Sequence, residues 1–253
     1  MTKRGIDHVA LTVRDLPGMA DFYQAVIGLA PLGGDGETRR LGAGGRLLLE
    51  LRADPAAKPR DPRHAGLFHT AFLLPGRADL ARWLRHAEST GTRLSGASDH
   101  GVSEALYLDD PEGNGIEIYR DRPADQWNRD GDRIGMFTRR LDLDDLAGVA
   151  DGPWRGAPED SLVGHVHLQV GELPPAEDFM RGDLGLNRTF EAPGGAWYGW
   201  GGYHHHLACN VWNSRAAGHR DPAMAGLAEV VLADPARSGA VMTDPWGTRF
   251  RVV

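Results

Sequence analysis

Residues 8–29 read HVALTVRDLPGMADFYQAVIGL, and residues 165–186 read HVHLQVGELPPAEDFMRGDLGL. The two stretches align without a gap, so that His8 matches His165 and Leu29 matches Leu186. The closing segments DPEGNGIEIY (110–119) and DPWGTRFRVV (244–253) also match. Because such self-similarity marks repeated structural units, the sequence predicts two homologous halves. We place them at 1–122 and 161–253, joined by a polar linker at 123–160.

Each half is itself doubled into a strand, a helix and three further strands. In the first unit a strand opens at His8, after which Asp15 can cap a helix and Gly28 can end it. In the second unit a strand opens at His69, and a helix carries Trp83 on its apolar face. The second half is compressed, because only residues 234–240 stand where its last helix would be.

Composition narrows the classes of function. The chain has 253 residues, of which 41% are hydrophobic and 25% charged, as is typical of globular proteins. A net charge of −7 without a long basic run argues against nucleic acid as a partner. The single cysteine, Cys209, excludes an intrachain disulfide and a cysteine-based zinc site. No segment predicts a leader or a membrane span, so we expect a cytoplasmic protein without a membrane partner.

The segment SDHGVSEALYLDDPEGNGIEIY (98–119) carries the most chemistry. Within it Glu117 interrupts an apolar strand, which indicates metal ligation, an ion pair or exposure. His8 and His69 open equivalent strands, and units paired about a local two-fold axis could bring them to Glu117. Two imidazoles and one carboxylate are the ligand set of an iron(II) or manganese(II) site with open positions. We therefore predict His8, His69 and Glu117 as metal ligands.

The same segment resembles a known family. His100, Tyr107, the turn 110–113 and Glu117 follow one another as in ring-cleaving extradiol dioxygenases, with Ser98 a minor departure. The strings VRDLPGMADFYQAVIGL, ASDHGVSEALYLDDPEGNGIEIYRDRP and GGYHHHLACNVW resemble the two-domain catechol 2,3-dioxygenase (CatE-like) branch of the vicinal oxygen chelate superfamily, which includes glyoxalase I and bleomycin-resistance proteins. The resemblance covers nearly the whole chain. It implies an α+β fold in which tandem βαβββ modules pair into two glyoxalase-like domains with cupped mixed sheets.

The resemblance also implies an activity, which is metal-dependent extradiol cleavage of a catechol-like ring by O2. His100 would move protons during ring opening, and Tyr107 would hydrogen-bond a substrate oxygen. The segment 203–208 (YHHHLA) resembles the family's catalytic His-His segment, so we take His205 as a third catalytic residue. Two other interpretations stay open: the histidines are a remnant, or one of them forms a second, altered metal site with His165 and Glu229.

The metal is expected in the first half of the chain. In the best-known two-domain members of the family the working metal lies in the second domain. Here the second half has Glu229 at the place of His69 and Arg251 at the place of Glu117. An arginine at a ligand position repels a divalent cation, so the second domain is expected to have lost its metal site.

Two other functions fit the same fold. A glyoxalase-like lyase or isomerase would use Glu50 as a fourth ligand, although an ion pair of Glu50 with Arg52, Arg46 or Arg120 is the simpler expectation. A non-catalytic binding or resistance protein would use an aromatic-lined cup, for which Trp197, Trp200 and Trp212 are candidates. Self-association of the chain is compatible with all three.

Overall fold

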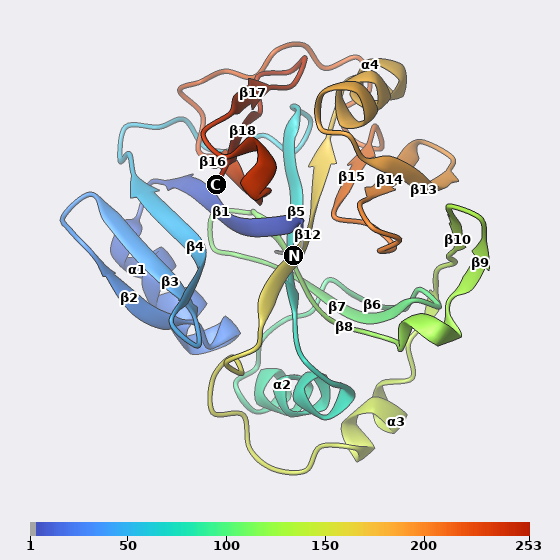
Figure 1. The fold of residues 1–253 in the computed structure, drawn as a ribbon. Coiled ribbons are helices and arrows are strands. Elements are labelled where there is room, and N and C mark those ends of the chain that lie inside the picture. The colour runs from blue at the N-terminus through green and yellow to red at the C-terminus, as the bar shows by residue number, and fades with distance from the viewer. Residues whose placement is uncertain (1–3) are drawn as a thin grey trace.

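The computed structural model describes residues 4–253, which form two mixed sheets, one of seven and one of nine strands. The seven-stranded sheet consists of β1 (Gly5–Val13), β2 (Ala30–Gly34), β3 (Thr38–Ala43), β4 (Arg46–Ala53), β16 (Gly226–Ala233), β17 (Val241–Thr243) and β18 (Arg249–Val252). Its strand order is β17-β18-β16-β1-β4-β3-β2. In Figure 1 its blue strands lie on the left and its red strands above the centre.

The nine-stranded sheet occupies the middle and right of Figure 1. It consists of β5 (Gly66–Leu73), β6 (Gly96–Asp99), β7 (Ser103–Asp109), β8 (Gly115–Asp121), β11 (Arg139–Arg140), β12 (Leu162–Gln169), β13 (Asn187–Ala192), β14 (Gly195–Gly199) and β15 (Leu207–Asn210). Its order is β11-β6-β7-β8-β5-β12-β15-β14-β13. A separate hairpin, β9 (Asn128–Asp130) with β10 (Arg133–Gly135), stands beside it.

Each sheet joins one repeated unit from each half of the chain. In the seven-stranded sheet β1 pairs with β16, and in the nine-stranded sheet β5 pairs with β12, both antiparallel. The structure confirms the four repeated units that the sequence predicts. The expected pairing of the first unit with the second, which would have let them form one site together, is not observed. They do not share a sheet, because the central strand of each unit finds its antiparallel partner in the other half.

The helices repeat as the strands do. α1 (Leu16–Phe22) continues as a π-helical turn, Tyr23–Ile27, and α4 (Leu173–Asp178) continues as Phe179–Asp183. As predicted, Asp15 caps α1 by accepting a hydrogen bond from the Gly18 amide. The second unit has α2 (Arg77–Ser89), whereas its counterpart in the second half is a single 3₁₀ turn, Pro235–Arg237. The predicted loss of that helix is therefore confirmed.

Gly28 ends the first helical segment in a left-handed conformation, with φ of 82°. A Cβ at this position would lie 2.8 Å from the Cα of Gly156, so the linker can pass closely only because residue 28 has no side chain. That linker is structured: it contains the hairpin, β11 and a short helix, α3 (Leu143–Gly148).

Trp83 connects the helices to the core. It is fully buried on α2, as predicted, and its indole N–H donates to the carbonyl of Val26. Apolar residues of both halves form one continuous buried cluster, so the two sheets rest on a shared core. Within residues 4–253 no helix is long and apolar enough to cross a membrane.

Candidate metal centre

A row of residues at matching positions on neighbouring strands of the nine-stranded sheet forms the site. Glu117 on β8 and His165 on β12 both lie opposite Ala71 on β5, so they flank its small side chain. His69 stands two residues before Ala71 on β5, and therefore on the same face of the sheet. Tyr107 on β7 extends the row beyond Glu117. The sheet register alone thus directs two imidazoles, a carboxylate and a phenol to one place.

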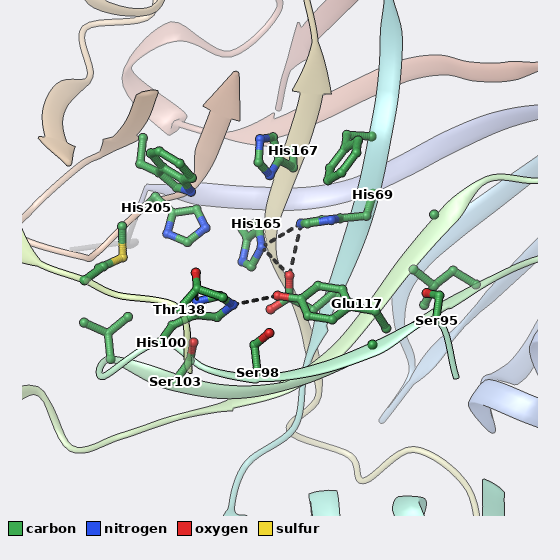
Figure 2. Close-up of a pocket in the computed structure, with 18 of the residues that line it drawn as sticks. His69, Ser95, Ser98, His100, Ser103, Glu117, Thr138, His165, His167 and His205 are labelled. Carbon is green, nitrogen blue, oxygen red and sulfur yellow. Dashed lines mark hydrogen bonds and ion pairs between the residues drawn. The ribbon is translucent and has the colours of Figure 1, made fainter. Parts of the chain in front are cut away.

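Figure 2 shows His69, His165 and Glu117 pointing toward one another. The Oε2 atom of Glu117 lies 3.0 Å from Nε2 of His69 and 3.2 Å from Nε2 of His165. The two Nε2 atoms are 3.3 Å apart. All three residues are buried, and their ligand atoms fall within 4.8 Å of one another. This group can hold a metal ion.

The chemistry of the three donors fits a divalent cation. Burial lowers the pKa of His165, which favours the neutral imidazole that a metal requires. Burial also raises the pKa of Glu117, but its interactions with His165 and His69 outweigh that effect and hold the pKa well below its usual range. Two neutral nitrogens and one anionic oxygen leave a divalent ion with positive charge and open coordination positions.

The structure places His8 away from this group. His8 lies on β1 in the seven-stranded sheet, where its Nδ1 is 2.5 Å from Asp7. His165, which matches His8 in the repeat, joins His69 and Glu117 in its stead. The reason is the strand pairing: β5 lies beside β12, and β1 lies beside β16.

The seven-stranded sheet has an equivalent row. Glu229 and Arg251 occupy the positions of His69 and Glu117, as their register against β18 and β16 shows. Glu229 accepts from Arg249 at 2.8 Å and from Arg251 at 3.0 Å, and Arg52 approaches it at 3.4 Å. An ion-pair network therefore stands where the other sheet has its candidate metal ligands.

Glu50 belongs to that network as well. It lies on β4, 2.7 Å from Nε of Arg52 and 3.3 Å from Nε of Arg40. The expected ion pair with Arg52 is confirmed. Glu50 is thus on a different sheet from His69 and Glu117, and it is not among the described residues that group with them.

His100 and Tyr107 form a pair at the cavity wall. Nε2 of His100 lies 2.8 Å from the Tyr107 hydroxyl, and its Nδ1 lies 2.9 Å from the carbonyl oxygen of Phe137. Because a carbonyl only accepts, Nδ1 carries the proton, and Nε2 of the neutral ring accepts from Tyr107. Burial, followed by the charge of Glu117, raises the pKa of Tyr107 well above its usual value. Tyr107 therefore remains a protonated phenol.

The three consecutive histidines do three different things. His205 lines the cavity, and its ring centre lies 4.1 Å from that of His165. His204 is hydrogen-bonded to Asp121 at 2.8 Å, and Nδ1 of His206 accepts from the Trp200 amide. All three are buried in the segment that leads directly into β15.

The site opens into a cavity of about 600 Å³. In Figure 2, His100, Ser98 of β6 and Ser103 of β7 lie below Glu117 and His165, whereas His167 lies above them. Tyr107 also lines the cavity, as does an aromatic wall. The wall consists of Phe68, His167, Phe190, Trp197 and Trp212. His167 contacts Phe68 at 4.9 Å between ring centres, and burial lowers its pKa well below the usual value, so the wall is uncharged. Trp200, the third tryptophan considered, is not part of the lining and donates instead to the Leu184 carbonyl.

Several contributors to the site were not foreseen. His167 and the segment 136–138 of the linker line the cavity, and Asp121 lies behind it as the hydrogen-bond partner of His204. His165 and His167 are two residues apart on β12, and this spacing predicts that both side chains face the same side of the sheet. The Phe137 carbonyl is a backbone group, so no sequence signal could have identified it.

The chain is similar to known proteins. The glyoxalase/bleomycin resistance protein/dioxygenase superfamily matches residues 5–118. The chain is 38% identical over 228 residues to a catechol-2,3-dioxygenase of Bacillus subtilis, which covers 88% of this chain and 80% of that one. The chain belongs to this superfamily. It is also 31% identical over 123 residues to biphenyl-2,3-diol 1,2-dioxygenase 2 of Rhodococcus globerulus, covering 45% of this chain and 61% of that one.

Solved structures of superfamily members share the fold. The chain superposes on a protein described as a dioxygenase from Bacillus subtilis with a TM-score of 0.64 and 14% identity, covering 98% of this chain and 84% of the other. Glyoxalase I from Zea mays gives a TM-score of 0.61 and 15% identity, covering 99% and 92%. The predicted tandem glyoxalase-like architecture is confirmed.

Proposed function

We propose that the protein is an extradiol dioxygenase that cleaves a catechol-like ring with O2, using iron(II) or manganese(II) held by His69, Glu117 and His165. One observation carries the proposal: the three ligand atoms of these residues converge within 4.8 Å at the wall of a cavity. The names of the relatives, a catechol-2,3-dioxygenase and biphenyl-2,3-diol dioxygenases, point to the same reaction. A bound divalent metal would supply Lewis acidity to both oxygens of the diol and activate O2.

The chain's own residues have separate tasks in this proposal. His205 is a neutral base at the cavity wall, because burial lowers its pKa well below the usual value. It accepts a proton from a hydroxyl of the incoming diol. Tyr107 donates its one proton to Nε2 of His100 at 2.8 Å, so its hydroxyl oxygen is left to accept a hydrogen bond from a substrate hydroxyl. The pair is in turn anchored through Nδ1 of His100 to the linker at Phe137.

The cavity favours a substituted ring as substrate. About 600 Å³ lies within the ~300–1,000 Å³ range of sites that take ligands larger than a single ring. The aromatic wall of Phe68, Trp197 and Trp212 offers stacking and edge contacts to an apolar substituent. We therefore propose that the preferred diol carries an apolar or aromatic group next to its hydroxyl-bearing ring.

The glyoxalase-like alternative loses its fourth ligand, because Glu50 pairs with Arg52 on the other sheet. A protein that only binds its ligand would use the same cavity but would not convert the diol. Oxygen uptake by iron- or manganese-loaded protein, measured against a series of catechols together with the ring-opened product, separates these possibilities. We expect one molecule of O2 to be taken up for each molecule of diol that is cleaved. If the loaded protein takes up no oxygen with any diol, the proposed activity is wrong.

The role of Tyr107 has a matched control within the chain. Tyr107→Phe is expected to lower kcat by about tenfold to a hundredfold with metal content unchanged, because it removes one hydrogen bond made in the reacting complex. Tyr198→Phe also removes a buried hydroxyl, but one outside the cavity and without a hydrogen-bond partner among the described residues. That variant should keep full activity. Equal losses in both variants would contradict the role of Tyr107.

A further inference from the structure

A buried chain of hydrogen bonds begins at His205, behind the cavity wall. Nδ1 of His205 lies 2.7 Å from Nδ1 of His204, and Nε2 of His204 lies 2.8 Å from Oδ1 of Asp121. Asp121 is the last residue of β8, the strand that carries Glu117, whereas the two histidines come from the other half of the chain. Neither of these two hydrogen bonds involves a candidate metal ligand.

The direction of the hydrogen bonds follows from elementary donor and acceptor rules. An ionised carboxylate only accepts, so Nε2 of His204 must carry a proton. In the neutral ring of His204, Nδ1 is then an acceptor. The single proton between the two Nδ1 atoms therefore belongs to His205. Because a neutral imidazole carries one proton, Nε2 of His205 is left with its lone pair available to the cavity.

Both partners of His205 are held firmly. The ring of His204 contacts Tyr203, 4.1 Å away between ring centres, and Trp127, 5.0 Å away. The second oxygen of Asp121, Oδ2, accepts from the Tyr203 hydroxyl at 2.9 Å, and that hydroxyl lies 2.9 Å from the hydroxyl of Tyr119. His204 itself is fully buried, and only the Asp121 end of the hydrogen-bond chain is partly exposed. The arrangement fixes both ring orientation and proton position.

We propose that Asp121 and His204 are positioning residues that set the tautomer of His205, keeping the proton on Nδ1 and the lone pair of Nε2 toward the substrate. The proposal rests on the proposed function for its catalytic meaning, but the tautomer itself is a property of the metal-free protein. A carboxylate that orients one histidine through its ring nitrogen is a known device in hydrolytic triads. Here the orientation passes through two imidazoles in series.

The variant Asp121→Asn tests the mechanism with little change of shape. An asparagine amide can donate to Nε2 of His204, which would move the His204 proton to Nδ1 and so reverse the bond to His205. His205 would then carry its proton on Nε2, facing the cavity. Asp125→Asn is the matched control, because Asp125 is exposed on the next segment of the chain.

The experiment is ¹⁵N imidazole NMR of metal-free protein, with the His205 signals assigned from their absence in His205→Asn. Wild type and Asp125→Asn are expected to show protonated Nδ1 and unprotonated Nε2 at His205, and Asp121→Asn the reverse. The wild-type spectrum decides by itself should Asp121→Asn fail to fold: a proton on Nε2 of His205 overturns the proposal. Unchanged His205 signals in folded Asp121→Asn overturn it as well.

A kinetic measurement links the tautomer to turnover. In loaded protein Asp121→Asn is expected to lower kcat by about a hundredfold with KM changed little, because general-base catalysis contributes ~10²–10⁴. A change in KM alone would contradict a positioning role. If no diol is turned over by wild type, the proposed function fails while the tautomer result stands.

Discussion

The two sheets carry different residues at the same positions of the same framework. In the nine-stranded sheet His165, His69 and Glu117 converge on one point. In the seven-stranded sheet the equivalent positions hold His8, Glu229 and Arg251, and Glu229 is bound by three arginines. Register and fold therefore determine where side chains meet, and the residue types at those positions determine whether the meeting point can bind a cation.

The largest expected difference between the sheets is catalytic. His205→Gln, on the cavity wall, is expected to lower kcat by ~10²–10⁴ because it removes the proposed base. His8→Gln, in the equivalent row of the other sheet, should leave kcat unchanged. Steady-state kinetics of both variants, at equal metal content, checks the comparison. A comparable loss of kcat in His8→Gln would contradict the assignment of catalysis to the nine-stranded sheet.

Metal-linked stability sharpens the comparison further. Manganese(II) at a hundred times its dissociation constant is expected to raise the free energy of unfolding by about 2.7 kcal/mol, since it binds only the folded state. Glu117→Gln should abolish that gain, because the anionic ligand is lost. Arg251→Gln, the equivalent change in the other sheet, should retain it. Urea unfolding with and without metal measures the gain, and a metal-independent stability in wild type would contradict the account.

The ion-pair network should matter for stability and not for turnover. Glu229→Gln is expected to destabilise the fold by about 2 kcal/mol, because it leaves arginines facing each other around a buried position. The partly exposed arginines keep this below the ~3–5 kcal/mol of fully buried pairs. Urea unfolding and kcat, measured on the same sample, check both halves of the prediction.

Acid should weaken the same network. Burial raises the pKa of Glu229, but its hydrogen bonds to Arg249 and Arg251 and the charges of Arg251 and Arg52 outweigh this, so the pKa in the folded state lies below its usual value. The unfolded state then binds more protons, and the stabilisation is present above pH ~4.5 and is lost as pH falls through the folded pKa. Stability of wild type should thus decline more steeply below pH ~4.5 than that of Glu229→Gln. If the two proteins lost stability equally as the pH falls, the ion pairs of Glu229 would contribute nothing to the stability of the fold.

The smallest effect concerns the aromatic wall. Trp212 lies 5.5 Å from Phe68 and 5.5 Å from His167 between ring centres, and it is partly exposed at the cavity. Trp212→Leu is expected to reduce kcat/KM for a phenyl-substituted catechol about fivefold relative to catechol, which is worth about 1 kcal/mol. Unsubstituted catechol serves as the internal control. An equal loss for both diols would place the role of Trp212 in the structure rather than in specificity.

Much of the site could be predicted from residues that lie close together in the sequence. The distance in sequence between Tyr107 and Glu117 spans one hairpin, so their pairing across β7 and β8 follows from alternation and turn chemistry. Likewise, His69 and Glu117 lie on neighbouring strands of one repeated unit. These short-range relations require only the strand period and the repeat.

The third member of the group could not be chosen in this way. His8 and His165 are equivalent in the repeat, and each opens a strand with the same pattern. Which of them meets His69 depends on whether β5 pairs with β1 or with β12, a choice between long-range contacts that local propensity does not encode. Asp121 was missed for the same reason, because its partner His204 belongs to the other half of the chain.

We propose that His165, and not His8, completes the metal site with His69 and Glu117 on the nine-stranded sheet. The most direct test is metal analysis of His165→Ala and His8→Ala, each purified without chelators and then reconstituted with iron(II) or manganese(II). We expect one equivalent of metal in wild type and in His8→Ala, and much less than one in His165→Ala. Full metal content in His165→Ala, with loss in His8→Ala, would contradict the account.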